Sequence, residues 1–179
     1  MDPTQLIDDL IAREGGYVAR AADKGGPTRY GVTQAVARAH GYTGNMALLP
    51  RDIAAAIYRA DYWMRPGLAP IAAIAPGIAG ELFDTGVNMG TATAAAFLRR
   101  ALNALNRSGT DYADIPATGA IDARTIAALT AFLHLRGAGG EAVLLKALDA
   151  LQGERYLALA ETRPANEAFL YGWLANRIG

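Results

Sequence analysis

The sequence contains no cysteine among its 179 residues. The chain therefore forms neither a disulfide framework nor a zinc–thiolate site, and a cysteine nucleophile is excluded. Lysine is nearly absent as well, because Lys24 and Lys146 are the only two and the other cations are arginine. The formal net charge is zero, which argues against a general polyanion-binding role, so we expect no nucleic acid partner.

Long apolar runs are also missing. The longest uncharged stretch, Pro66 to Gly80, is too short to span a bilayer and is interrupted by proline. The first residues, Met1 to Gln5, lack the basic segment and apolar core of a signal peptide. We therefore expect a soluble protein without membrane insertion, made in the cytoplasm without a signal peptide.

What the chain does contain is alanine and leucine at helical spacing, with 52% hydrophobic residues overall. This pattern predicts an all-α, mainly helical fold, with residues 17–32 irregular or forming a small β-hairpin after the first helix. Helix starts are expected near Asp2, Pro50, Pro76, Thr91, Asp122, Glu141 and Pro164, and Thr33 is expected to cap a short helix to Ala39. We place a soft boundary between residues 1–91 and 92–179, with both parts packed into one compact body.

Glu14 ends the first predicted helix, just before Gly15 and Gly16. It follows Leu10 by four residues and Ile11 by three, so helical spacing places it on the buried stripe. Partial burial would favour a protonated carboxyl, which is the form that can donate a proton to a glycosidic oxygen at neutral pH. The spacing alone allows two interpretations, a general acid or a solvated residue at a helix end.

Several polar and aromatic residues are candidates to act with Glu14. Asp23, nine positions later, could orient water or stabilise positive charge on a sugar, although an aspartate beside Lys24 and glycines is also typical of a turn. The threonines Thr28 and Thr33 offer hydroxyls that could hold water or a substrate oxygen. Further candidates for a substrate groove are Tyr17, Tyr30, Gln34, Tyr62 and Asn88, of which the tyrosines could equally be core residues and Asn88 a helix cap. No metal or organic cofactor is expected, because this hydrolysis needs only carboxyl groups and water.

Two sets of motifs carry a family resemblance. The opening Glu14-Gly15-Gly16-Tyr17, with Asp23, Gly25-Gly26, Thr28 and Gly31-Val32-Thr33, resembles the start of glycoside hydrolase family 108, which contains lysozyme-like N-acetylmuramidases. The second half is similar to the peptidoglycan-binding region that accompanies this family. That likeness rests on Thr118-Gly119-Ala120-Ile121-Asp122 and Gly172-Trp173-Leu174-Ala175-Asn176-Arg177.

The resemblance implies a lysozyme-like fold with Glu14 as the catalytic acid. The order of Glu14, Asp23 and Thr28 is similar to the catalytic triad of phage-type lysozymes, except that Thr28 comes one residue early and Arg29 occupies the expected place. We expect an inverting mechanism, with carboxyl groups roughly 6.5–9.5 Å apart; about 5–5.5 Å would indicate a retaining one.

The implied substrate is peptidoglycan, cut at the β-1,4 bond between N-acetylmuramic acid and N-acetylglucosamine. The implied setting is a monomeric phage or prophage endolysin that reaches the wall in the periplasm with a holin or another export device. Two alternatives stay open: a non-catalytic peptidoglycan-binding accessory, and a secretion or particle-release factor.

Overall fold

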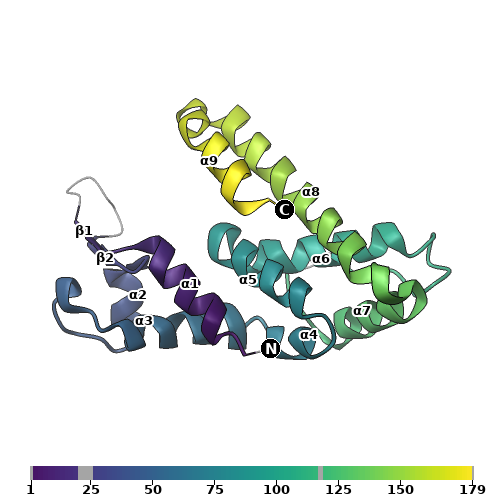
Figure 1. The fold of residues 1–179 in the computed structure, drawn as a ribbon, viewed down its shortest axis with the longest axis horizontal. Coiled ribbons are helices and arrows are strands. Elements are labelled where there is room, and N and C mark those ends of the chain that lie inside the picture. The colour runs from purple at the N-terminus through teal and green to yellow at the C-terminus, as the bar shows by residue number, and fades with distance from the viewer. Residues whose placement is uncertain (1, 20–25, 117–118, 179) are drawn as a thin grey trace. The chain divides into compact units, whose positions relative to one another are not determined.

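The computed structural model describes residues 2–19, 26–116 and 119–178, and these are mainly helical (Figure 1). The chain divides into two compact units, residues 1–65 and residues 66–179. The first unit contains a small three-stranded sheet beside its helices, while the described part of the second is helical with loops. The predicted fold class, mainly α-helical with a small β-structure after the first helix, is confirmed.

The first unit begins with a helix and continues into the sheet. Its elements in chain order are α1 (Thr4–Glu14), β1 (Tyr17–Val18), β2 (Thr28–Arg29), β3 (Val32–Thr33), α2 (Gln34–Ala39), a 3₁₀ turn (Met46–Leu48), α3 (Arg51–Tyr58) and a π-helical turn (Arg59–Met64). Helix α1 packs on α3. The apolar stripe of α1 is buried at Ile7, Leu10 and Ile11, as its helical spacing predicts.

The sheet is antiparallel with the strand order β1-β2-β3. Strands β2 and β3 form a hairpin in which Arg29 pairs with Val32 across a two-residue turn. The turn residues Tyr30 and Gly31 have φ values of 54° and 73°. Positive φ at both central positions matches the right-handed twist of the flanking strands, which is why such short hairpins prefer this turn.

The second unit consists of α4 (Leu68–Ile74), α5 (Pro76–Met89), α6 (Thr91–Leu105), α7 (Ala123–Arg136), a 3₁₀ turn (Gly137–Gly139), α8 (Gly140–Thr162), a 3₁₀ turn (Pro164–Asn166) and α9 (Glu167–Arg177). Helices α5, α6 and α8 pack on one another, and α9 returns along α8 (Figure 1). Large side chains buried in this unit include Ile78, Leu82, Leu98, Leu102, Leu129, Phe132, Leu144 and Leu148.

Polar side chains of the second unit fix its helix ends and its long loop. Glu141 of α8 accepts hydrogen bonds from the backbone N–H groups of Gly77 and Ile78, at 2.7 and 3.3 Å, and so caps α5 from another helix. The fully buried Arg99 of α6 donates to the Pro116 carbonyl at 2.7 Å and pairs with Asp122 at 2.9 Å. These contacts bind both ends of the described part of the loop that precedes α7.

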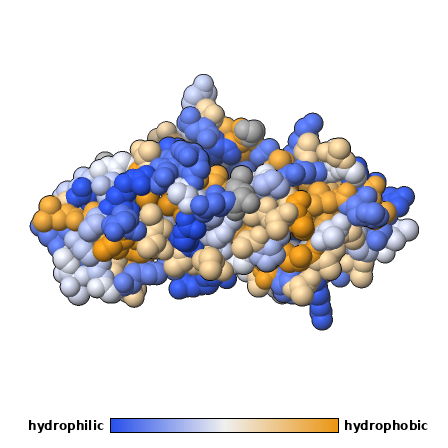
Figure 2. Space-filling view, turned by 60° about the horizontal axis from the view of Figure 1, so that its bottom comes forward, coloured by the Kyte–Doolittle hydropathy of each residue, from blue (hydrophilic) through white to orange (hydrophobic). Residues whose placement is uncertain are grey.

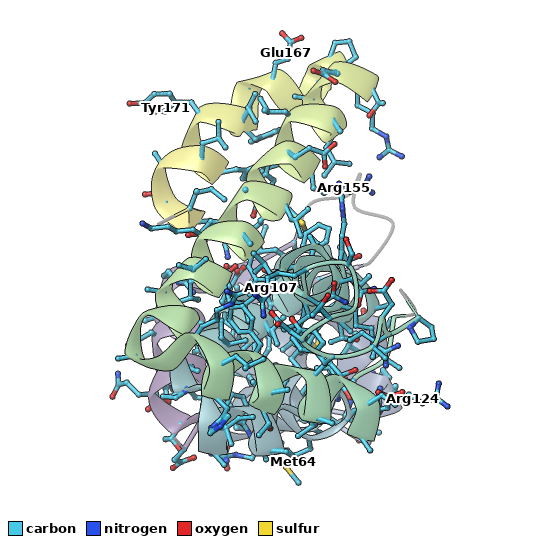
Figure 3. All side chains as sticks on the ribbon, turned by 90° about the vertical axis from the view of Figure 1, so that its right-hand side faces the viewer. Met64, Arg107, Arg124, Arg155, Glu167 and Tyr171 are labelled. Carbon is cyan, nitrogen blue, oxygen red and sulfur yellow. The ribbon has the colours of Figure 1, made fainter. Side chains whose placement is uncertain are left out.

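Aromatic rings join α9 to α8. The Trp173 ring stacks on Tyr156 with centroids 5.2 Å apart, and Phe169 lies 6.2 Å from Trp173. Tyr171 is 85% exposed and points away from the helix pair in Figure 3. On the face drawn in Figure 2, hydrophobic and hydrophilic residues are interspersed. Within the described residues, no helix is long and apolar enough to cross a bilayer.

Several element boundaries differ from the sequence expectation. Helix α1 begins at Thr4, so Pro3 rather than Asp2 is its N-cap, although the Asp2 carboxylate still accepts from the Thr4 N–H at 3.2 Å. Helix α5 extends to Met89 rather than ending near Gly86, because Gly86 is buried inside it and Gly90, with φ of 91°, ends it. Helix α4 was not expected, since its segment contains proline.

Candidate active site

Glu14 is the last residue of α1, and Gly15 ends the helix with φ of 75° and an N–H bond to the Ile11 carbonyl at 3.3 Å. Glu14 is exposed, so the expectation that it lies on the buried stripe is wrong. The reason is its position in the last turn, beside two glycines with no side chains to cover it. A methyl group built on Gly15 or Gly16 would meet none of the described residues within 4 Å. Among the residues that the structure describes, no side chain covers this side of the Glu14 position.

On another side, Glu14 lies against the hairpin turn. A methyl group built on Gly31 would stand 3.1 Å from both Cγ and Oε2 of Glu14, and 2.4 Å from the Tyr58 hydroxyl oxygen. The glutamate side chain and the tyrosine hydroxyl thus occupy the space above Gly31. Only glycine fits this position, because of both its positive φ and this close approach.

Tyr58 is 4% exposed, and its hydroxyl donates to the Tyr30 carbonyl at 2.9 Å. Burial raises the pKa of the Tyr58 hydroxyl, and the negative charges of Glu14 and of an ionised Tyr62 raise it further. The Tyr62 ring lies 5.7 Å from the Tyr58 ring, centroid to centroid. Burial also raises the pKa of Tyr62, with a smaller contribution from Asp61. Both phenols are therefore neutral at physiological pH.

Two predicted site residues, Tyr30 and Tyr62, contact Tyr58. The Tyr30 carbonyl accepts its hydrogen bond, and the Tyr62 ring lies beside its ring. Three other predicted site residues lie in the small sheet: Tyr17 is 45% exposed on β1, and Thr28 and Thr33 face each other across β2 and β3. The Thr33 hydroxyl accepts from the Val36 N–H at 3.3 Å and caps α2, which confirms its predicted capping role. Arg29 lies with its guanidinium carbon 5.0 Å from the Tyr30 ring centroid.

The remaining predicted residues are placed elsewhere or lie outside the description. The Gln34 side chain lies at Gly26, where its Oε1 would be 3.2 Å from an added methyl group. Asn88 belongs to α5 in the second unit, and its amide donates to the carbonyl and carboxylate of Asp84, each at 2.9 Å. Asp23 lies outside the described residues, so its separation from Glu14 stays a prediction.

Sequence reasoning missed the parts played by Tyr58 and Gly31 as neighbours of Glu14. Their contact joins segments 28 positions apart, as the hydrogen bond from Tyr58 to Tyr30 records. A two-residue turn between short strands was a detectable signal for Gly31, whereas no pattern in the sequence pointed to Tyr58 as a neighbour of Glu14. Among the described residues, no cluster of histidine, aspartate and glutamate is placed to hold a metal ion.

The first unit also contains a cleft whose lining does not include Glu14, Gly31 or Tyr58. It is a cleft of about 580 Å³ lined by His40–Gly44, Ile53, Ala56, Ile57 and Ala60. His40 pairs with Asp61 at 2.9 Å near this cleft. None of the predicted site residues lines it, so we place the candidate active site at Glu14.

Comparison with known proteins defines the class of protein. Residues 7–90 match the model of the glycosyl hydrolase 108 family, and residues 93–178 match that of a predicted peptidoglycan domain. Together these matches define a lysozyme-like hydrolase that acts on peptidoglycan. The first half of the chain thus matches the glycosyl hydrolase 108 family and the second half a predicted peptidoglycan domain, in the order that the sequence motifs indicate.

A solved structure supports the fold. SagA of Brucella abortus is 22% identical to this chain with a TM-score of 0.66, and the match covers 96% of this chain and 86% of SagA. At this level of identity the likeness shows the fold alone. The search of curated proteins finds no match.

Proposed function

We propose that this glycoside hydrolase is an N-acetylmuramidase that cuts the β-1,4 bond between N-acetylmuramic acid and N-acetylglucosamine, with Glu14 as general acid. The observation that carries the proposal is the setting of Glu14. Its carboxyl contacts the glycine of a tight turn on one side and has the open Gly15–Gly16 segment on another. A sugar chain can approach backbone closely at two successive glycines, which carry no side chain of their own.

The proposed reaction begins when a bound glycan covers the exposed carboxyl. Covering removes water from Glu14 and favours its neutral, proton-donating form. Glu14 then gives its proton to the glycosidic oxygen as the bond from that oxygen to the anomeric carbon breaks. A water molecule adds to the anomeric carbon from the opposite face and loses its proton to the Asp23 carboxylate, which gives an inverted product.

The other predicted residues serve substrate binding in this proposal. Tyr17 is the most exposed of the ring candidates in the sheet, and its face is suited to stacking on a sugar. Thr28 lies on the neighbouring strand, directly opposite Val18. Its hydroxyl is the one we assign to hold the attacking water.

The proposed setting is a monomeric endolysin that is made in the host cytoplasm and reaches the wall through a holin or another export device. The match of residues 93–178 to a predicted peptidoglycan domain supports a glycan strand as the partner of the second half. In this proposal the second half holds the enzyme on its insoluble substrate while the first half cuts.

The test is digestion of purified peptidoglycan by the wild type and by Glu14→Gln. We expect the amide variant to lose activity by roughly 10²- to 10⁴-fold, because it cannot donate the proton. Glu154→Gln, at an exposed position of α8, is the matched control and should digest normally. Mass spectrometry of the fragments should show new reducing ends on N-acetylmuramic acid.

Three results would contradict the proposal. Anhydromuramic ends would indicate a transglycosylase, and reducing ends on N-acetylglucosamine would indicate a different bond. Full activity of Glu14→Gln would show that another group supplies the proton. Finally, the anomeric configuration of fresh product, read by NMR, decides between the inverting and the retaining route.

A further inference from the structure

The buried Tyr58 places its hydroxyl at Gly31, where the Glu14 side chain also lies, and the proposed chemistry leaves this hydroxyl without a task. Tyr58 ends α3 at the point where the chain continues as the π-helical turn Arg59–Met64. Within that turn region the Arg65 N–H bonds to the Ala60 carbonyl at 2.9 Å, five residues back. Such π-helical turns are rare in proteins, and those that occur are often found at functional sites. Here the turn begins directly after the tyrosine whose hydroxyl lies, like the Glu14 side chain, at Gly31.

The Tyr58 hydroxyl is held in one orientation. Its proton is donated to the Tyr30 carbonyl at 2.9 Å, and its ring is buried. Because burial and the nearby Glu14 charge raise the pKa of this hydroxyl, it remains a neutral donor across the pH range in which wall enzymes work. The bond therefore fixes the Tyr30–Gly31 turn to α3 under all working conditions.

The Tyr30–Gly31 turn also limits where the Glu14 side chain can lie. The Cγ and Oε2 atoms of Glu14 stand 3.1 Å from the position that a methyl group on Gly31 would occupy, and the Tyr58 oxygen stands 2.4 Å from it. The two side chains thus share the space that Gly31 leaves empty. If Tyr58 lost its hydroxyl, the carboxyl of Glu14 would gain room to move and the turn would lose its tie to α3.

We infer that Tyr58 is a positioning residue for Glu14, holding the carboxyl at the place from which it protonates the glycosidic oxygen. This inference rests on the proposed function. It adds that the geometry of the acid is set by a hydroxyl bonded to the backbone of the hairpin turn. Tyr58 itself touches neither the substrate nor the reacting atoms in this assignment.

The test is the kinetics of Tyr58→Phe on soluble glycan fragments. Loss of the hydroxyl should lower kcat by up to about 100-fold, because misplacing a reacting group by about an ångström can cost that much. KM should change little, because the variant disturbs the acid rather than the sugar contacts. A general loss of fold would instead lower the amount of active enzyme without a selective effect on kcat per folded molecule.

Tyr42→Phe is the matched control within the same unit. The Tyr42 hydroxyl also donates to a backbone carbonyl, that of Asn45, at 2.9 Å, and it also crowds a glycine, Gly44, at 2.6 Å from an added methyl group. The two variants remove the same kind of hydrogen bond, but only Tyr58 neighbours Glu14. The Tyr58 bond is part-buried and the Tyr42 bond is exposed, so Tyr58→Phe should lose more thermal stability. A fall in kcat per folded molecule is expected for Tyr58→Phe alone.

A double variant separates failure of this inference from failure of the proposed function. In the Glu14→Gln background, Tyr58→Phe should have no further effect on residual activity, because a positioning residue has nothing left to position. If Glu14→Gln abolishes turnover while Tyr58→Phe matches Tyr42→Phe, the positioning role is wrong and the general acid stands. If Tyr58→Phe lowers the residual activity of Glu14→Gln as strongly as it lowers wild-type activity, Tyr58 acts independently of Glu14.

Discussion

Glu81 gives the sharpest prediction about stability, because it is a carboxyl group inside the packed second unit. It lies on α5, and its Oε1 accepts from the Thr85 hydroxyl at 3.0 Å. The Gln152 amide, oriented to satisfy both of its partners, donates to the same oxygen and to the Arg177 carbonyl, each at 3.1 Å. Desolvation by burial nevertheless dominates and, with smaller repulsion from Asp149 and Asp84, raises the pKa of Glu81 to about 7.

The size and sign of the effect follow from this pKa. The ordinary value is 4.5, and each unit of difference is worth roughly 1.4 kcal/mol, so ionised Glu81 destabilises the folded state by at most about 3.5 kcal/mol. The folded state binds this proton more tightly than the unfolded state. The contribution of Glu81 to stability is therefore complete below about pH 4.5, is lost as the pH rises to about 7, and is constant above it.

Glu81→Gln removes the charge and keeps an oxygen that can accept from Thr85 and Gln152. We expect the variant to be more stable than the wild type by about 1–3 kcal/mol at pH 8 and to show no gain at pH 4.5. Urea unfolding followed by the fluorescence of Trp173, which stacks on Tyr156 in the same unit, measures this difference. Glu154→Gln, at an exposed site on α8, should show no pH-dependent gain. An equal difference between Glu81→Gln and the wild type at both pH values would refute the reasoning.

Two further predictions concern Asp122 and Gly31. The Thr125 backbone and hydroxyl, together with Arg99, hold the pKa of Asp122 down to about 2, so its contribution to stability should persist above pH 4 and be lost as the pH falls from about 4 to 2; thermal unfolding of Asp122→Asn should show a lowered Tm at pH 7 and a smaller difference near pH 2. Gly31→Ala and Gly41→Ala both place a side chain at positive φ, at a shared cost of about 1–2 kcal/mol. Described neighbours crowd Gly31, whereas an added methyl on Gly41 meets none of the described residues within 4 Å. Gly31→Ala should therefore be the less stable of the two variants and alone lose hydrolytic activity, and equal losses would contradict the close approach of Tyr58 and Glu14 to Gly31.

The sequence was most informative where a residue type has one common structural role, such as capping a helix. Asp122 forms a capping box with Thr125 at the start of α7, and Thr33 caps α2, both at predicted positions. The helix start expected near Glu141 also matches, because α8 begins at Gly140. Each of these signals depends on hydrogen bonds within three or four residues, so no knowledge of the tertiary structure was needed.

Helix α4 shows the opposite case. Pro70 was expected to interrupt its segment, but Pro70 is the third residue of the helix. The first N–H groups of a helix have no intrahelical partner, so proline removes nothing there. The burial of Leu68 and Ile71 then stabilises the helix through packing that local propensity does not report.

The candidate site was predictable in its residue types and not in its geometry. Family motifs identify Glu14, and helical spacing alone assigned it to the wrong environment, because spacing says which face a residue occupies and not whether anything covers that face at the helix end. The contacts that define its position come from Gly31 and Tyr58, which belong to a strand turn and to a later helix.

The paired contacts of Tyr42 with Gly44 and of Tyr58 with Gly31 illustrate the limit of prediction from sequence. The first joins residues two positions apart and resembles local turn chemistry, while the second closes over the length of the hairpin, α2 and α3. No repeating sequence pattern marks a hydroxyl that fills the space beside a glycine. Only the folded structure shows that, of these two tyrosines, Tyr58 is the one beside Glu14, the proposed acid.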